Sequence, residues 1–213
     1  MNLNEKLLRL YAITDQKWTK EKTLVEQVEL AIKNGVTMVQ LREKCLSQED
    51  NIKLAKEIKA ITSKYKVPLI INDCIDVTLS CNAEGIHVGQ SDVSANDVRK
   101  IIGENKILGV SASTPEEAVI AEAMGADYLG VGAVFNTSTK SDAKVVSHEV
   151  LSKICSSVSI PVVAIGGISK DNILMLKDSG ISGVAVVSAI FAQKDIPAET
   201  KKLRALADEV ARK

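Results

Sequence analysis

The sequence predicts a single (β/α)8 TIM barrel, and three observations favour this fold. Short apolar runs rich in valine and isoleucine recur along the chain, as expected of parallel strands covered on both faces. Segments with helical periodicity separate them, giving eight strand–helix units of roughly 25 to 30 residues each. No linker rich in proline and glycine interrupts the chain, so we expect one catalytic domain over residues 1–213.

The expected strands follow one another at regular intervals. Each is a run of about four to eight residues in which valine, isoleucine and leucine dominate. We expect strands over residues 10–14, 38–43, 68–73, 85–90, 107–113, 128–135, 162–168 and 183–190.

The expected helices lie between these strands and carry start or stop signals. The first has an apolar stripe and ends at Gly35, a typical helix C-cap. Thr114 and Glu117 have the spacing of a capping box, with Pro115 at the first helical position. We expect helices over residues 20–34, 48–65, 95–102, 115–124, 148–156, 170–179 and 197–211, with a short one around 75–81.

A doubly wound open sheet is the alternative architecture. That fold usually has fewer strands, and its dinucleotide-binding form needs a glycine-rich turn after the first strand. The corresponding stretch here, LYAITDQKW, contains no glycine. The barrel is therefore favoured.

Composition restricts the partners and the compartment. Lys plus Arg equals Asp plus Glu at 27 each, so the composition has no excess of positive charge that would indicate binding to nucleic acid or to an anionic membrane. The chain start lacks the features of a signal peptide, and no apolar run reaches the length of a membrane span. The four cysteines form no C-x-x-C pair, which favours reduced thiols in the cytoplasm. We expect small-molecule substrates as partners, and a homo-oligomer stays open.

The stretch MVQLREKC, residues 38–45, alternates apolar and polar side chains. Gln40, Arg42 and Lys44 share one face of the expected strand, while Val39 and Leu41 share the other. The polar face therefore rises towards the C-terminal end of the strand, where barrel enzymes place their chemistry.

Most of the remaining expected strands also end in, or are followed by, residues that suit a binding site at this same end of the barrel. They are Asn72 and Asp73, Gln90 and Asp92, Ser111, Thr137 to Lys140, Gly166 and Gly167, and Val187 and Ser188.

These strand exits predict two anion-binding regions. Arg42, Lys44 and Lys140 suit an anion with several oxygens, although Lys44 alone also fits a solvated charge beyond the strand end. Asp73 and Asp92 suit Mg²⁺, although either also fits a helix N-cap.

The second region follows the seventh and eighth strands. The run IGGI and the run VVSAIFA, which can begin a short extra helix, suit a phosphate bound by backbone N–H groups. A tight turn is the alternative for the two glycines.

These motifs together resemble the thiamine-phosphate synthase (thiamine-phosphate pyrophosphorylase) family over nearly the whole chain. The resemblance rests on QLREK (40–44), IND (71–73), GIHVGQSD (85–92), LGVSAST (108–114), GADYLGVGAVFNTSTK (125–140), VVAIGGI (162–168) and the last strand. It implies a transferase that joins hydroxymethylpyrimidine diphosphate to hydroxyethylthiazole phosphate, giving thiamine phosphate and pyrophosphate.

The resemblance also implies a role for individual residues. The pyrimidine diphosphate would contact Gln40, Leu41, Arg42, Glu43, Lys44, Asn72, Ser111 and Lys140, of which Arg42, Lys44, Ser111 and Lys140 would be catalytic. The thiazole phosphate would contact Thr137, Ser138, Thr139, Gly167, Val187 and Ser188. Asp73 and Asp92 would hold Mg²⁺. The family reaction resembles a dissociative displacement, which needs leaving-group stabilisation rather than a strong general base.

His87, His148 and the cysteines are interpreted as structural, and Asp15 receives no role. The nearest rival is a thiazole tautomerase of the same superfamily, which would not need the diphosphate and metal residues. A non-catalytic phosphate-binding regulator would leave them idle. A sugar-phosphate isomerase or epimerase would need a base poised over a carbon acid, and none stands out.

Overall fold

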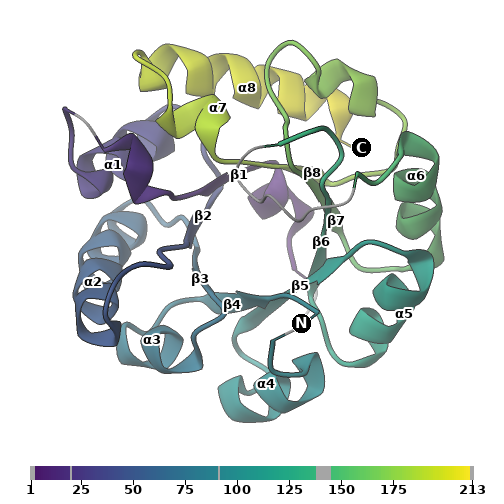
Figure 1. Ribbon diagram of the computed structural model, residues 1–213, viewed down its shortest axis with the longest axis horizontal. Coiled ribbons are helices and arrows are strands. Elements are labelled where there is room, and N and C mark those ends of the chain that lie inside the picture. The colour runs from purple at the N-terminus through teal and green to yellow at the C-terminus, as the bar shows by residue number, and fades with distance from the viewer. Residues whose placement is uncertain (1–2, 20, 91, 138–144, 212–213) are drawn as a thin grey trace.

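Eight parallel strands pair in sequence order and close on themselves, which confirms the predicted (β/α)8 barrel (Figure 1). The computed structural model describes residues 3–19, 21–90, 92–137 and 145–211. The strands are β1 (Leu10–Ile13), β2 (Met38–Leu41), β3 (Leu69–Asn72), β4 (Gly85–Val88), β5 (Ile107–Ala112), β6 (Tyr128–Gly132), β7 (Val162–Ile165) and β8 (Gly183–Val186). All eight end earlier than the apolar runs suggest, so most of the polar residues beyond them lie in loops at the barrel mouth.

Helices surround the strands as an outer ring (Figure 1). The α-helices are α1 (Leu24–Lys33), α2 (Gln48–Lys64), α3 (Ile75–Ser80), α4 (Ala95–Ile102), α5 (Pro115–Ala123), α6 (His148–Ser157), α7 (Ser188–Phe191) and α8 (Ile196–Val210). The described residues also form three short 3₁₀ helices, η1 (Glu5–Leu8), η2 (Gln16–Trp18) and η3 (Ile173–Leu176).

Side-chain caps set several helix starts. Thr23 and Glu26 form a reciprocal capping box, so α1 begins at Leu24 and not at residue 20 as predicted. The predicted box before α5 is only half formed. The Thr114 side chain accepts a hydrogen bond from the Glu117 N–H, but the Glu117 carboxylate accepts from the Ser113 N–H instead of from Thr114.

The helix predicted over residues 170–179 was wrong, because only the short 3₁₀ helix η3 forms there. The Asn172 side chain accepts from the Ser169 N–H and donates to the Gly167 carbonyl, so it holds the loop after β7 and makes no cap. At the other end, Asp178 takes a positive φ of 64°. Such local side-chain bonds compete with helix formation.

The core has two layers, one on each side of the barrel wall. Val39 and Leu41 belong to the outer layer between strands and helices, while Met38 belongs to the interior cluster with Tyr11. Gln40 lies on the interior side too, since it hydrogen-bonds to Tyr11. This arrangement confirms the predicted facing of MVQLREKC.

The segment η1 packs against the end of the barrel opposite the mouth. Its last residue, Leu8, is fully buried and belongs to the interior cluster, with Leu3 and Leu7 packed beside it. Backbone contacts join η1 to β1 and β8. Because this end is filled with apolar side chains, the barrel interior opens at the C-terminal end of the strands.

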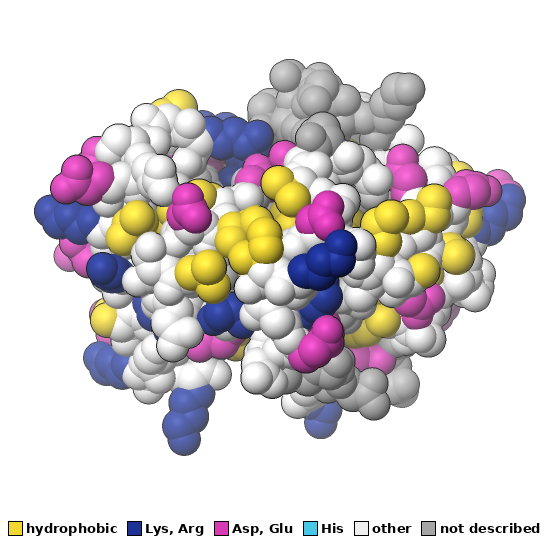
Figure 2. All heavy atoms as spheres, turned by 90° about the horizontal axis from the view of Figure 1, so that it is seen from below, with side chains coloured by type: hydrophobic (Ala, Val, Ile, Leu, Met, Phe, Trp, Pro, Cys, Tyr) yellow, Lys and Arg dark blue, Asp and Glu magenta, His cyan; other side chains and the backbone are white. Residues whose placement is uncertain are grey.

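Hydrophobic side chains also appear on the outside of the helix ring. Figure 2 shows one side of the barrel, where they lie interspersed with acidic and basic groups. Exposed apolar residues include Ile101 on α4 and Val119 and Ile120 on α5. Among the residues that the structure describes, no helix combines the length and apolar character that a membrane span requires.

Candidate functional site at the barrel mouth

A cavity of about 690 Å³ lies at the C-terminal end of the strands and is lined by residues from all eight strands or the loops that follow them. That volume is typical of small-molecule sites. The predicted site residues that line it are Gln40, Arg42, Lys44, Asn72, Asp73, Asp92, Ser111, Thr137, Gly167, Val187 and Ser188. The predicted residues Ser138, Thr139 and Lys140 lie outside the described residues.

Leu41 and Glu43 are the described site predictions that do not line this cavity. Leu41 is only 1% exposed and packs in the outer core layer, because alternate side chains of β2 point away from the interior. Its side chain therefore faces the helices.

Glu43 instead holds two loops together. Its carboxylate accepts hydrogen bonds from Thr14 Oγ1 at 2.7 Å and from the Gln16 N–H at 3.2 Å. Thr14 Oγ1 in turn accepts from the Arg42 N–H at 3.0 Å. Burial raises the pKa of Glu43, with the hydrogen bonds from Thr14 and Gln16 opposing that shift. Glu43 thus supports the backbone that presents Arg42.

Arg42 and Lys44 supply the positive charge at one side of the cavity. Arg42 is half-buried and Lys44 is exposed. Lys44 lies close enough to Asp73 to lower the pKa of that carboxyl. Within the described part of the chain neither cation forms a salt bridge, so both charges remain available to an anionic ligand.

Asp73 and Asp92 are neighbours across the loops that follow β3 and β4, as predicted. Burial raises the pKa of Asp73, and the charge of Asp92 and a hydrogen bond with its side chain raise it further. Asn72 Nδ2 opposes this by donating to Asp73 Oδ2 at 2.5 Å. Asp92 Oδ2 accepts from the Gly89 N–H at 2.7 Å.

Neither Asp73 nor Asp92 caps a helix, so the alternative of a helix N-cap is wrong for both. Cys74 is the residue before α3 and makes no side-chain cap, and Ser94 caps α4. Asp73 has a φ of 60°, so the backbone turns sharply to direct this carboxylate into the cavity.

Two adjacent carboxylates suit Mg²⁺, because a divalent cation would relieve their mutual repulsion and prefers hard oxygen ligands. Among the described residues no third acidic, histidine or cysteine side chain joins them. Water and ligand oxygens would complete the coordination, as is usual for Mg²⁺ beside phosphates.

The opposite side of the cavity is built mainly from backbone. Gly166 and Gly167 follow β7 with positive φ values of 98° and 67°. A Cβ at Gly167 would lie 2.4 Å from the Asn136 carbonyl oxygen, so only glycine fits the close approach of these loops. The predicted extra helix after β8 is present as α7, directly after Val187. N–H groups at such turns and helix starts favour an anion.

A chain of hydrogen bonds between residues that line the cavity crosses the barrel interior, and the sequence did not predict it. Gln40 Nε2 donates to Tyr11 Oη at 2.8 Å, and Tyr11 Oη lies 2.9 Å from Tyr128 Oη. His87 Nδ1 lies 3.0 Å from Tyr128 Oη, and His87 Nε2 lies 3.0 Å from Ser111 Oγ. The signal in the sequence was one polar side chain inside each of the strands β1, β2, β4, β5 and β6, at positions that face inwards.

His148 and Asp15 have structural surroundings. His148 lies at the start of α6, where its Nε2 is 3.4 Å from the Lys177 carbonyl oxygen. Asp15 caps η2 by accepting from the Lys17 N–H at 3.1 Å, which gives a role to a residue that had none.

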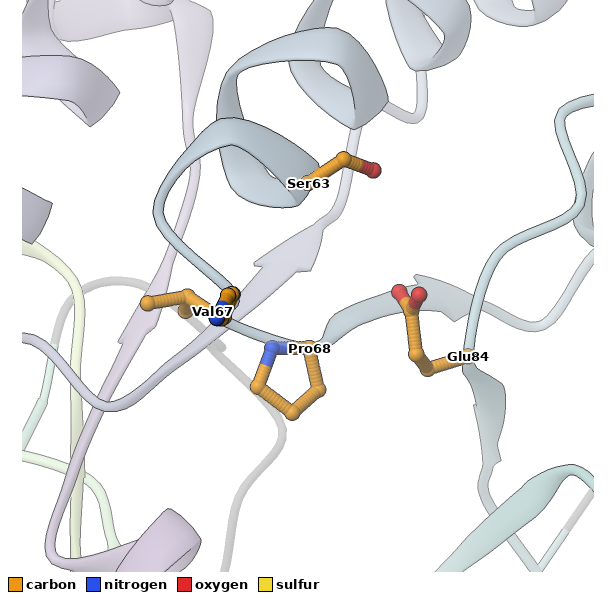
Figure 3. Close-up of a pocket in the computed structure, with 5 residues that line it drawn as sticks. Ser63, Val67, Pro68 and Glu84 are labelled. Atoms are coloured by element: carbon orange, nitrogen blue, oxygen red, sulfur yellow. The ribbon is translucent and has the colours of Figure 1, made fainter.

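A smaller hollow of about 270 Å³ lies between the end of α2 and the start of β3 (Figure 3). Ser63, Lys66, Val67, Pro68 and Glu84 line it. The Glu84 carboxylate is occupied by Lys59 and by the Leu69 N–H. This hollow is therefore a surface feature of the end opposite the mouth.

Comparison with known proteins agrees with this geometry. The family model for thiamine monophosphate synthase matches residues 10–190. A thiamine-phosphate synthase of Ruminiclostridium cellulolyticum is 58% identical over 194 residues, covering 91% of this chain and 92% of the relative. One from Clostridium tetani is 51% identical, covering 94% and 96%. The structure of a thiamine phosphate pyrophosphorylase from Pyrococcus furiosus superposes with a TM-score of 0.89 at 39% identity, covering 97% and 98%.

Proposed function

Since the chain belongs to the thiamine-phosphate synthase family, we propose that its barrel mouth joins a pyrimidine diphosphate to a thiazole phosphate, producing thiamine phosphate and pyrophosphate. The observation that carries the residue roles is the division of one cavity into two unlike ends. Cations and carboxylates lie at one end, and backbone N–H groups of glycine turns lie at the other.

The end formed by the loops after β2, β3 and β4 suits the diphosphate. Arg42 would bind its oxygens with a planar fork and Lys44 with a point charge. Asn72 and Ser111 would add neutral donors, and Lys140 is assigned here from the sequence alone. Asp73 and Asp92 would hold Mg²⁺, which would supply charge neutralisation for the departing pyrophosphate.

The end formed by the loops after β7 and β8 suits the phosphate of the thiazole. The N–H groups around Gly167 and Ser188 would bind it without a formal positive charge. Thr137 lines the cavity nearby, and Ser138 and Thr139 are assigned to this end from the sequence alone.

The proposed reaction is a dissociative displacement. The bond between the pyrimidine methylene carbon and the diphosphate oxygen breaks, and the oxygen keeps the electron pair. The thiazole nitrogen then supplies the pair for the new carbon–nitrogen bond. The residues bind, orient and stabilise charge, so most of their contribution is positional and electrostatic.

The hydrogen bond between His87 and Ser111 pairs two residue types that nucleophilic enzymes often use together. The second ring nitrogen of His87 faces the Tyr128 hydroxyl. In nucleophilic triads a carboxylate usually orients the histidine from that side. The geometry thus favours an orienting role for Ser111 over a nucleophilic one.

The test is an assay of the purified protein with Mg²⁺ and both substrates, following pyrophosphate release and thiamine phosphate formation. We expect both products in equal amounts, and neither after chelation of the metal or omission of the thiazole phosphate. Isomerisation of the thiazole phosphate without joining would favour the tautomerase. Binding of both ligands without any turnover would favour the non-catalytic regulator.

We also propose that the protein works in the cytoplasm on these small molecules. Free thiols at Cys45, Cys74 and Cys81 support a reducing compartment. The equal numbers of acidic and basic residues support neither nucleic acid nor an anionic membrane as a partner.

A further inference from the structure

We propose that Tyr11 and Tyr128 are positioning residues, which act through Gln40 and His87 to fix Ser111 as a hydrogen-bond donor to the bound substrate. Gln40, Tyr11, Tyr128, His87 and Ser111 form what we call the interior chain. The kinetic part of this inference rests on the proposed function. The arrangement of protons within the interior chain does not rest on that function, and it is tested separately.

The interior chain is continuous from one side of the cavity to the other. Its four contacts are between 2.8 and 3.0 Å, and they join five residues from five strands or strand ends. Tyr11 is 1% exposed and Tyr128 is fully buried. All five members of the interior chain line the cavity, with Gln40 and Ser111 at its two ends. The two tyrosines therefore connect groups that face the same ligand space.

The direction of the hydrogen bonds in the interior chain follows from the number of hydrogens that each group carries. An amide nitrogen can only donate, so Tyr11 Oη accepts from Gln40 Nε2. The single Tyr11 hydrogen then points to Tyr128 Oη, and the Tyr128 hydrogen points to His87 Nδ1. His87 must carry its own proton on Nε2, from which it donates to Ser111 Oγ.

The opposite direction is disfavoured. If His87 Nδ1 donated to Tyr128, Tyr128 would donate to Tyr11, which already accepts from Gln40. The Tyr11 hydrogen would then have no acceptor among the described residues, at a site that is 1% exposed. Burial raises the pKa of both tyrosines, so their hydroxyls keep their protons at neutral pH.

Two glycines leave the space that the side chains of the interior chain occupy. A Cβ at Gly109 would lie 2.2 Å from Tyr128 Cζ and 2.5 Å from His87 Nδ1. A Cβ at Gly130 would lie 3.0 Å from His87 Cε1. Since β5 and β6 lack side chains at these positions, the Tyr128 and His87 rings can meet inside the barrel.

This direction has a chemical consequence at each end. With Nε2 donating, Ser111 Oγ is an acceptor from His87, and its own hydrogen is available for a substrate oxygen. Because Gln40 uses its amide nitrogen internally, its Oε1 is the atom left for the ligand. His87 in this tautomer cannot take a proton from Ser111, so the pair acts as an orienting device and not as a nucleophile with its base.

The direct test is the tautomer of His87, measured by ¹⁵N NMR on metal-free, substrate-free protein at pH ~8, above the ordinary histidine pKa of about 6.5. The chain has two histidines, and exposed His148 serves as an internal control. We expect His87 to carry its proton on Nε2 alone. A proton on Nδ1 in the wild-type protein would overturn the proposal without any variant.

Tyr128→Phe removes the hydroxyl that donates to Nδ1, and we expect it to give a mixture of His87 tautomers. The matched control is Tyr65→Phe. It removes a hydroxyl bond of 2.7 Å to Glu29 on the outside of the barrel, and we expect an unchanged His87 spectrum. An unchanged spectrum in folded Tyr128→Phe would contradict the proposal. If that variant does not fold, the wild-type tautomer decides.

In the two-substrate assay, Tyr128→Phe should weaken use of the pyrimidine diphosphate about tenfold in kcat/KM, the size expected for a lost orienting hydrogen bond. The KM for the thiazole phosphate should stay the same, as should both KM values in Tyr65→Phe. An equal rise in KM for both substrates would indicate a general structural role and overturn the positioning role. A wild-type protein without turnover would refute the proposed function, and the tautomer would still decide the proton arrangement.

Discussion

The Asp73 carboxylate lies half-buried beside a second carboxylate, and both features disfavour its charged form. Its pKa is raised by burial first and by Asp92 second. A carboxyl whose pKa is raised in the folded state contributes most to stability below the unfolded value, which is about 3.9. That contribution is lost as the pH rises through the higher folded pKa. Ionisation of Asp73 beside Asp92 is therefore unfavourable in the metal-free protein.

Asp73→Asn should raise the melting temperature of the metal-free protein at neutral pH, because asparagine cannot ionise and tolerates the positive φ at this position. The same change should abolish the stabilisation that Mg²⁺ gives to the wild-type protein. Differential scanning calorimetry with and without Mg²⁺ measures both effects. A lower melting temperature without metal would show that the charge pair is not unfavourable.

Asp92→Asn should reduce turnover by roughly a hundredfold or more while the fold stays intact. Asparagine retains an oxygen that can accept from the Gly89 N–H, so the loop after β4 keeps its anchor. Steady-state kinetics across a Mg²⁺ titration provide the measurement, with circular dichroism to check the fold. The matched control is Asp97→Asn, an exposed carboxylate on α4 beside Lys100. An Asp92→Asn enzyme with unchanged Mg²⁺ dependence would remove Asp92 from the metal site.

At the scale of elements, one arginine ties α4 to the N-terminal ends of β5 and β6. The Arg99 guanidinium donates to the carbonyl oxygens of Gly125, Gly103 and Lys106 and forms a salt bridge of 2.6 Å with Asp127. Asp127 also accepts from the Leu108 N–H at 2.8 Å. Arg99 and Asp127 are both buried, so neither charge is compensated by water.

Asp127→Ala should lower the free energy of unfolding by about 3–5 kcal/mol, because it leaves the Arg99 charge buried without its partner. Lys100→Ala, on the exposed side of the same helix, should change it by less than about 0.5 kcal/mol. Chemical denaturation of the two variants gives the comparison. A loss below about 1 kcal/mol in Asp127→Ala would mean that the pair is screened.

The contact between α1 and α2 should depend on pH through Glu29. Hydrogen bonds from Tyr65, Lys64 and Lys33 lower the pKa of Glu29 from 4.5 to about 2. A lowered folded pKa means that the stabilising contribution is present above 4.5 and is lost as the pH falls towards 2. Glu29→Gln should therefore melt at a lower temperature than the wild type at pH ~7, with a difference that shrinks in that acidic range. A difference that does not vary with pH would exclude ionisation as its cause.

The elements differ in how far the sequence could predict them. The strands follow from continuous apolar runs, and α4 begins where Ser94 caps it, so both were predicted from local chemistry. The segment after β7 shows the limit. Its apolar pattern suits a helix, but the Asn172 side chain bonds back to the loop around Gly167, a contact that only the closed barrel creates.

The same contrast holds for the site. Arg42, Asp73, Asp92 and Ser111 were predictable because they lie at or just beyond the C-terminal ends of strands that must end at one mouth. The interior chain was not, because the meeting of Tyr11 with Tyr128 depends on closure of the barrel, which brings residues 117 positions apart into contact. Polar residues buried inside a barrel therefore need the strand register before they can be interpreted.

For the molecule as a whole, the proposed function requires two anion-binding ends in one cavity. The cations and carboxylates follow β2 to β4, while the Gly166–Gly167 turn follows β7 and the start of α7 follows β8 on the other side of the ring (Figure 1). This separation lets two negatively charged substrates occupy one mouth together. The proposed function depends on that simultaneous occupancy more than on any single residue.

Calorimetric titration with pyrophosphate and with the thiazole phosphate, each with and without Mg²⁺, tests this claim most directly. We predict that pyrophosphate binding requires Mg²⁺, that thiazole phosphate binding does not, and that saturation with one leaves the site for the other available. Competition between the two ligands, or an equal Mg²⁺ requirement for both, would contradict the assignment of two separate anion-binding ends.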